Sequence, residues 1–219
     1  MLKGAIFDFD GTLFDSMFIW DTIGEAYLRS IGYVPKENLN EVFKTFSLYQ
    51  AACYYQSEYG VTLSVDEIVN GIHIMIEKYY RNKVMHKSGV MDFLKYLQQN
   101  GVKMCIATAT DDYLVKATLE RCQMSEYFSK IFTCTSVGSG KDNPKIYREA
   151  LAYLGTEKSK TVVFEDAAYA LKTAKKDSFI TAAVYDRYEK NQEEVKILSD
   201  FYITDYSEAG TFRKFAPAI

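Results

Sequence analysis

The sequence is poor in the residues from which proteins build histidine- or cysteine-based sites. It holds two histidines, His73 and His86, and four widely spaced cysteines with no Cys-x-x-Cys pair. A zinc site or a histidine-based triad therefore has little to build on, and we expect reduced, structural thiols. Carboxylates, hydroxyls and lysines must carry any chemistry.

Two further classes of protein are disfavoured by charge and hydropathy. The net charge is -3 and no basic stripe is present, so there is no electrostatic case for nucleic acid binding. No apolar run approaches the roughly 20 residues that span a bilayer. The chain also starts in a strand-like segment rather than in a signal peptide. We expect a cytoplasmic protein, a monomer or weak homo-oligomer, with a small molecule as its partner.

The 219 residues suffice for one domain with a small insert. Apolar strand-like runs alternate with helical patterns from residue 87 onward, which predicts an α/β fold with a Rossmann-like parallel sheet covered on both faces. The predicted strands are 4–7, 102–108, 130–135, 161–164, 179–184 and 201–204. The predicted helices that join them are 90–100, 112–123, 144–154, 167–176 and 189–198.

A purely helical stretch interrupts this alternation. Helical spacing of apolar residues predicts helices over 17–31, 40–59 and 64–80, the last with a capping box from Ser64 to Glu67. We therefore expect a small helical domain at 15–86, inserted into a core domain formed by 1–14 and 87–219.

Acidic residues follow the first predicted strand. Asp8 and Asp10 lie two positions apart and would share a face at the strand end, and Gly11 allows the backbone to turn. Two like charges held so close favour a divalent cation or a shared proton. Aspartates also suit ordinary turns, but the coincidence of strand, paired acids, Gly11 and Thr12 favours a functional site.

The ends of later strands carry complementary groups. Thr108 ends one strand, and the hydroxyl and backbone amides that follow it suit an anion, although Thr110 or Asp111 equally suits a helix N-cap. Lys141 lies in a glycine-containing loop after the next strand. Glu165 and Asp166 follow a third strand, where they suit either a helix dipole or a metal ion.

Taken in order, these four elements resemble the four signatures of the haloacid dehalogenase-like hydrolases. The segment Asp8-Phe9-Asp10-Gly11-Thr12 is similar to the first signature, and Thr108, Lys141 and the pair Glu165-Asp166 are similar to the others. The family lysine usually precedes Pro-x-Pro, whereas here only Pro144 is kept. A helical insert directly after the first signature is similar to the type 1 cap of subfamily I.

The resemblance implies a magnesium-dependent phosphatase that hydrolyses a small phosphorylated metabolite, in particular a sugar phosphate, through an aspartyl-phosphate. Asp8 would be the nucleophile and Asp10 the general acid and base, oriented by Thr12. The implied catalytic residues are Asp8, Asp10, Thr108 and Lys141. The implied substrate- and phosphate-binding residues are Gly11, Thr12, Thr108, Ala109, Lys141 and Trp20. The implied Mg²⁺ ligands are Asp8, Asp10 (through its backbone carbonyl), Glu165 and Asp166.

Two alternatives remain open. A sugar-phosphate mutase similar to β-phosphoglucomutase shares the core and the Glu165-Asp166 pair, but that subgroup has a histidine on the first cap helix where this chain has Trp20. A catalytically silent ligand-binding domain is the second alternative. It is disfavoured because loss of activity usually shows as a lost nucleophile, and Asp8 is present.

Overall fold

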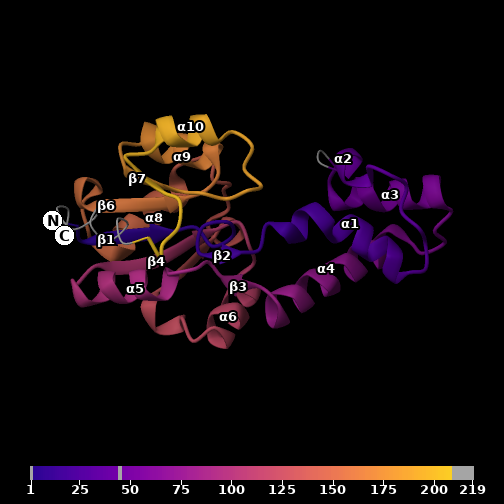
Figure 1. Cartoon of the computed structure of the whole chain (residues 1–219), viewed down its shortest axis with the longest axis horizontal. Coiled ribbons are helices and arrows are strands. Elements are labelled where there is room, and N and C mark those ends of the chain that lie inside the picture. Colours follow the sequence, from indigo (N-terminus) through magenta and orange to yellow (C-terminus); the bar gives the residue numbers. More distant parts are fainter. Residues whose placement is uncertain (1, 44–45, 209–219) are drawn as a thin grey trace. The chain divides into compact units, whose positions relative to one another are not determined.

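Six parallel strands form the centre of the computed structural model, which describes residues 2–43 and 46–208. Their order across the sheet is β5-β4-β1-β6-β7-β8, so the first strand lies between strands from the middle and the end of the chain. This confirms the predicted α/β fold with a Rossmann-like parallel sheet (Figure 1). The strands are β1 (Gly4–Phe7), β4 (Lys103–Thr108), β5 (Ile131–Thr133), β6 (Thr161–Glu165), β7 (Ile180–Val184) and β8 (Phe201–Ile203).

The central strands β1, β4 and β6 are buried at every residue except Lys103, because both faces of the sheet are covered. Right-handed crossovers put α5 and α6 on one face and α8, α9 and α10 on the other (Figure 1). Alternate residues serve the two faces: Ile6 packs with Tyr147 of α8, while Phe164 packs its ring against Phe93 of α5. These helices are α5 (Val90–Gln99), α6 (Asp112–Arg121), α8 (Lys145–Leu154), α9 (Ala168–Lys176) and α10 (Gln192–Leu198).

The chain divides into two compact units. One comprises the chain up to Ser16 and from Val84 onward, and the other is Met17–Lys83. The second unit is helical, with α1 packed on α2 and α4, and α3 packed on α4. Its helices are α1 (Phe18–Ser30), α2 (Leu39–Phe43), α3 (Leu48–Tyr59) and α4 (Val65–Asn82).

Local capping sets where these helices begin. The predicted capping box at Ser64 and Glu67 starts α4. The prediction of one helix over 40–59 is wrong, because Ser47 and Gln50 form a second capping box that starts α3. Residues 44–45, which belong to the predicted helix, lie outside the described residues.

Several short elements escaped prediction. The predicted strand 130–135 is shorter, because Thr133 caps a short helix, α7 (Cys134–Val137). The two-residue strands β2 (Phe14–Asp15) and β3 (Met85–His86) pair antiparallel where the chain leaves and re-enters the α/β unit. Two 3₁₀ turns, η1 (Ser125–Tyr127) and η2 (Lys158–Lys160), precede β5 and β6.

Among the helices in ranges 2–43 and 46–208, none has both the length and the apolar character that a membrane-crossing helix needs.

Candidate active site

Three carboxylates converge at the carboxyl ends of β1 and β6. These strands are neighbours in register, with Phe7 paired to Phe164, so Asp8 emerges beside Glu165 and Asp166. The backbone N–H of Asp8 continues the ladder by donating to the carbonyl of Phe164 at 2.9 Å. Each of the three acids offers an oxygen, and the three oxygens lie within 4.8 Å of one another.

This cluster is almost closed to solvent, and the pKa values of Asp8 and Asp166 are raised as a result. Burial, and after it the charge of Glu165, raise the pKa of Asp8 from 3.8 to about 6, although Lys141 opposes the shift. Burial also holds the pKa of Asp166 well above its usual value, and the charges of Asp8 and Glu165 add to that. Crowded anionic oxygens with raised pKa values favour a cation between them.

Lys141 supplies part of the missing positive charge. Its Nζ lies 2.5 Å from Oδ1 of Asp8 and 2.5 Å from Oε1 of Glu165, and the side chain is 3% exposed. Burial alone would lower the pKa of Lys141, but the charges of Asp8 and Glu165 outweigh it and raise that pKa. Lys141 is therefore a permanent cation. One lysine against three acids leaves room for a further cation.

Gly11 and Thr12 both lie against the Asp166 carboxylate. Gly11 has φ +73°, and a Cβ at this position would collide with the Asp166 carboxylate, so only glycine fits. The hydroxyl of Thr12 donates to Oδ1 of Asp166 at 2.9 Å. The hydroxyl of Thr12 thus orients Asp166, and the expectation that Thr12 orients Asp10 stays a prediction.

Asp10 is half-buried and held apart from the carboxylate cluster. The hydroxyl of Ser16 donates to Oδ1 of Asp10 at 2.5 Å, and the hydroxyl of Thr110 donates to Oδ2. Its carboxylate is not one of the three that could share an ion in the part of the chain that the structure describes. The predicted contact of Asp10 with a metal through its backbone carbonyl stays a prediction.

The remaining predicted residues lie in three places. Thr108 ends β4, is 1% exposed, and accepts a hydrogen bond on its hydroxyl from the N–H of Thr110 at 3.0 Å. Ala109 follows it and is exposed. Trp20 lies on α1 in the helical unit and is 49% exposed. Their predicted roles toward substrate stay predictions.

The residues present fit a hard divalent cation. All three donors of the cluster are carboxylate oxygens, which Mg²⁺ and Ca²⁺ prefer over nitrogen or sulfur. The turn at Gly11 leaves the Asp166 carboxylate free of any Cβ at its side. The donor set thus matches the predicted class of metal.

Comparison with known families decides the wider assignment. The sequence pattern of the haloacid dehalogenase-like hydrolases matches residues 5–184, which is most of the chain. The chain belongs to this family. The expectation of a hydrolase of the haloacid dehalogenase-like family is confirmed, and the geometry around Asp8 lies within the matched segment.

Relatives within the family are distant in sequence and close in fold. The chain is 23% identical over 174 residues to a phosphorylated carbohydrates phosphatase of Thermotoga maritima, covering 80% of this chain and 81% of the relative. It is 22% identical to hexitol phosphatase B of Escherichia coli, covering 94% of each. A crystal structure from Thermotoga maritima, provisionally described as a β-phosphoglucomutase, superposes with a TM-score of 0.86 at 19% identity, covering 97% of this chain and 99% of that one.

Three residues that donate hydrogen bonds to the acids of the site were not predicted to do so from the sequence. Ser16 binds Asp10 from six positions away across the turn at residues 11–13, and no helix or strand places two such residues in contact. Thr110 was weighed only as a cap or an anion ligand, and its hydroxyl instead binds Asp10 across 100 residues. Tyr147 is buried in α8 and donates to Oε1 of Glu165 at 3.2 Å. Only Thr110, next to the recognised strand end, carried a usable signal.

Proposed function

We propose that this hydrolase is a magnesium-dependent phosphatase that cleaves a small phosphorylated metabolite, in particular a sugar phosphate, through an aspartyl-phosphate on Asp8. The observation that carries the proposal is the position of Asp8. It lies beside a permanent cation, Lys141, and shares a possible metal position with Glu165 and Asp166. The names of the two relatives, which refer to phosphorylated carbohydrates and to hexitol, support the substrate class.

In the proposed first step, a carboxylate oxygen of Asp8 attacks phosphorus and the bond from phosphorus to the leaving alkoxide breaks. Asp10 gives its proton to that departing oxygen, because an alkoxide is a poor leaving group. In the second step Asp10 takes a proton from a water molecule that attacks the phosphoryl group. Inorganic phosphate leaves and the Asp8 carboxylate is restored.

The separate environments of the two acids support these separate roles. Asp8 is paired with Lys141, which keeps it available as an anion. Asp10 is half-buried and bound by the hydroxyls of Ser16 and Thr110, which fix the direction in which it can transfer a proton. Pairs of acids whose environments differ are typical of acid–base division of labour.

Charge neutralisation supplies most of the barrier lowering in such reactions. Asp8, Glu165 and Asp166, with the backbone carbonyl of Asp10, would hold Mg²⁺. The bound ion would screen the phosphoryl oxygens from the attacking carboxylate. Lys141 and Thr108, with the backbone N–H of Ala109 and the turn at Gly11 and Thr12, would bind the remaining oxygens.

We further propose that the helical unit is a cap domain, with boundaries near 15 and 86, and that Trp20 contacts the leaving group. The four cysteines are free, which supports a reducing compartment such as the cytoplasm. We propose a monomer or weak homo-oligomer as the working form.

The test is release of phosphate from para-nitrophenyl phosphate in the presence of Mg²⁺, followed by a screen of sugar phosphates. Release above background that disappears in Asp8→Asn supports a phosphatase. A silent ligand-binding domain would release none. Glucose 1-phosphate with a bisphosphate primer separates the mutase, which would yield the 6-phosphate isomer rather than free phosphate.

A further inference from the structure

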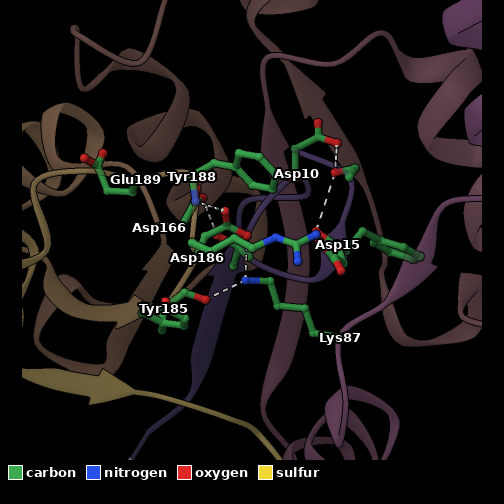
Figure 2. Close-up of polar contacts among 12 residues, drawn as sticks. Asp10, Asp15, Lys87, Asp166, Tyr185, Asp186, Tyr188 and Glu189 are labelled. Atoms are coloured by element: carbon green, nitrogen blue, oxygen red, sulfur yellow. Dashed lines mark hydrogen bonds and ion pairs between the residues drawn. The ribbon is translucent and has the colours of Figure 1, made fainter. Parts of the chain in front are cut away.

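A buried ion pair lies next to the site and takes no part in the proposed chemistry. Lys87 directly follows β3, and Asp186 comes two residues after the end of β7. The Nζ of Lys87 lies 2.9 Å from Oδ2 of Asp186, and the two side chains are 16% and 3% exposed (Figure 2). Asp186 is buried and Lys87 is partly buried, and charges so placed need further hydrogen bonds.

Those hydrogen bonds are present. The Nζ of Lys87 also donates to the carbonyl of Tyr185 at 2.6 Å, and the N–H of Tyr188 donates to the second oxygen of Asp186, Oδ1, at 2.9 Å. The side chain of Gln192 donates to the backbone carbonyl of Asp186 at 2.8 Å. Both oxygens of the carboxylate are thus bound, which fixes its orientation.

The pair is electrically linked to Asp166. Strand β7 is the neighbour of β6, and Glu165 pairs with Ala183, so the residues that follow the two strands emerge side by side. Asp186 follows β7 by two residues and is one of the charged groups that act on the Asp166 carboxylate. Asp186 is therefore within electrostatic range of the carboxylate cluster.

Lys87 also lies close in sequence to the point where the chain re-enters the α/β unit. The chain re-enters this unit at Val84, three residues before Lys87. The N–H of Lys87 donates to the carbonyl of Leu13 at 2.9 Å, just before the other crossing. One residue thus connects both linkers to the end of β7.

We propose that Lys87 and Asp186 are positioning residues that set the metal affinity of the cluster through Asp166. Asp186 adds negative potential without ligating the ion. Lys87 limits that potential and fixes the Asp186 carboxylate to the linker. The inference rests on the proposed metal-binding function. It assigns the strength of metal binding to a charge pair outside the four signature segments.

Opposite signs of charge give opposite expected shifts, which a merely structural role would not. The measurement is the dissociation constant for Mg²⁺ by isothermal titration calorimetry on the full chain at pH 8, without substrate. Asp186→Asn should raise the Mg²⁺ dissociation constant about three- to tenfold, and Lys87→Met should lower this constant by a similar factor. A change of one unit charge near a divalent ion has an effect of about this size when solvent partly screens the interaction. The double variant should return to within about twofold of the unmodified protein, because both charges are gone.

A matched pair provides the control. Lys158 and Asp177 also lie 2.9 Å apart, at the edge of the sheet away from the site where α9 leads into β7. Lys158→Met and Asp177→Asn should leave the Mg²⁺ dissociation constant unchanged. Lys87→Arg keeps the charge, so its Mg²⁺ dissociation constant should stay near that of the unmodified protein. This variant replaces Lys87→Met as the test if Lys87→Met does not fold.

The outcomes separate the two proposals. Shifts of the same sign in Asp186→Asn and Lys87→Met, or no shift in either, would overturn the charge-setting role while the metal site stands. Equal shifts in the Lys158 and Asp177 variants would overturn it too. Absence of Mg²⁺ binding by the unmodified protein would overturn the metal-dependent function itself, and the inference with it.

Discussion

The α/β unit and the helical unit differ in what they bury. Among the side chains that the structure describes, every buried charged or polar one other than tyrosine belongs to the α/β unit. The helical unit buries aliphatic residues and tyrosines, as where the rings of Tyr27 and Tyr55 lie 6.2 Å apart and the Tyr55 hydroxyl donates to the carbonyl of Gly24 at 2.7 Å.

This difference indicates the unit in which we expect the reaction to take place. A buried charge destabilises a fold unless it is paired, so a protein that keeps several together does so for a purpose. In the α/β unit they gather at one edge of the sheet, around Asp8. The helical unit carries no comparable cluster in its described residues, so substitutions there should alter substrate affinity or stability rather than the reaction.

The largest effect should come from the centre of the charged cluster. Asp8→Asn removes the nucleophile while keeping its size, and turnover of para-nitrophenyl phosphate should fall by about 10⁵-fold or more, as losses of a catalytic nucleophile do. Asp15→Asn is the matched control, because this acid lies nearby on β2 with a side chain that is 53% exposed. Full activity in Asp8→Asn would refute the mechanism.

Removal of Mg²⁺ should be nearly as severe. Chelation should abolish phosphate release, and added Mg²⁺ should restore it, because Asp8, Glu165 and Asp166 otherwise repel one another and the phosphate. Circular dichroism of the chelated protein tests whether the fold survives. If activity persists undiminished after exhaustive chelation, the carboxylate cluster has another purpose.

A smaller loss is expected one contact away from the reacting atoms. Thr110→Val removes a hydrogen bond to Asp10, and kcat should fall about 10- to 100-fold, part of what general acid–base catalysis contributes. Thr118→Val, which removes a buried hydroxyl from α6, is the control for altered stability. Equal losses in both variants would mean that Thr110 acts only through the fold.

The helical unit should respond more weakly. Trp20→Ala removes a half-exposed ring from α1 and should raise KM for the preferred substrate a few-fold, about as much as one apolar contact contributes. The value of kcat should stay within about twofold. Tyr49→Ala, on the exposed surface of α3, should change neither. A large loss of kcat in Trp20→Ala would contradict the expectation that substitutions in the helical unit leave the reaction itself unchanged.

The smallest effect tests a charge far from the cluster. Hydrogen bonding to Arg148 and Lys158 holds the pKa of Asp177 below its usual value despite partial burial. A carboxyl whose pKa is lower in the folded than in the unfolded state stabilises the fold at pH values above its unfolded-state pKa. This stabilisation is lost as the pH falls through its folded-state pKa. Asp177→Asn should therefore cost roughly 1 kcal/mol at pH 7 and almost nothing near pH 2, measured by urea unfolding at both pH values. Activity should not change.

Short-range patterns in the sequence were enough to predict the six strands of the parallel sheet, within a few residues at their ends, and the acids that follow them. Apolar runs such as Gly4–Phe7 are strong signals, and parallel strands bring whatever follows them to one edge. The partner of Thr12 lies 154 residues away, so only the folded chain reveals that its hydroxyl binds Asp166. The pair of Lys87 and Asp186 is hidden for the same reason.

The errors at element ends have local causes. The capping box of Ser47 and Gln50 was present in the sequence, but the apolar spacing on both sides of it masked the break between α2 and α3. Strands β2 and β3 have two residues each, which is too short for any periodicity to show. Local capping thus decided where α3 and α7 begin, and tertiary pairing formed β2 and β3.

The central claim is that Asp8 takes up phosphorus beside an ion shared with Glu165 and Asp166. A crystal structure of the protein with Mg²⁺ and beryllium fluoride tests it most directly. The account predicts beryllium bonded to a carboxylate oxygen of Asp8, with the ion held by Asp8 and Asp166. Beryllium fluoride bound elsewhere, or an ion that touches neither acid, would contradict it.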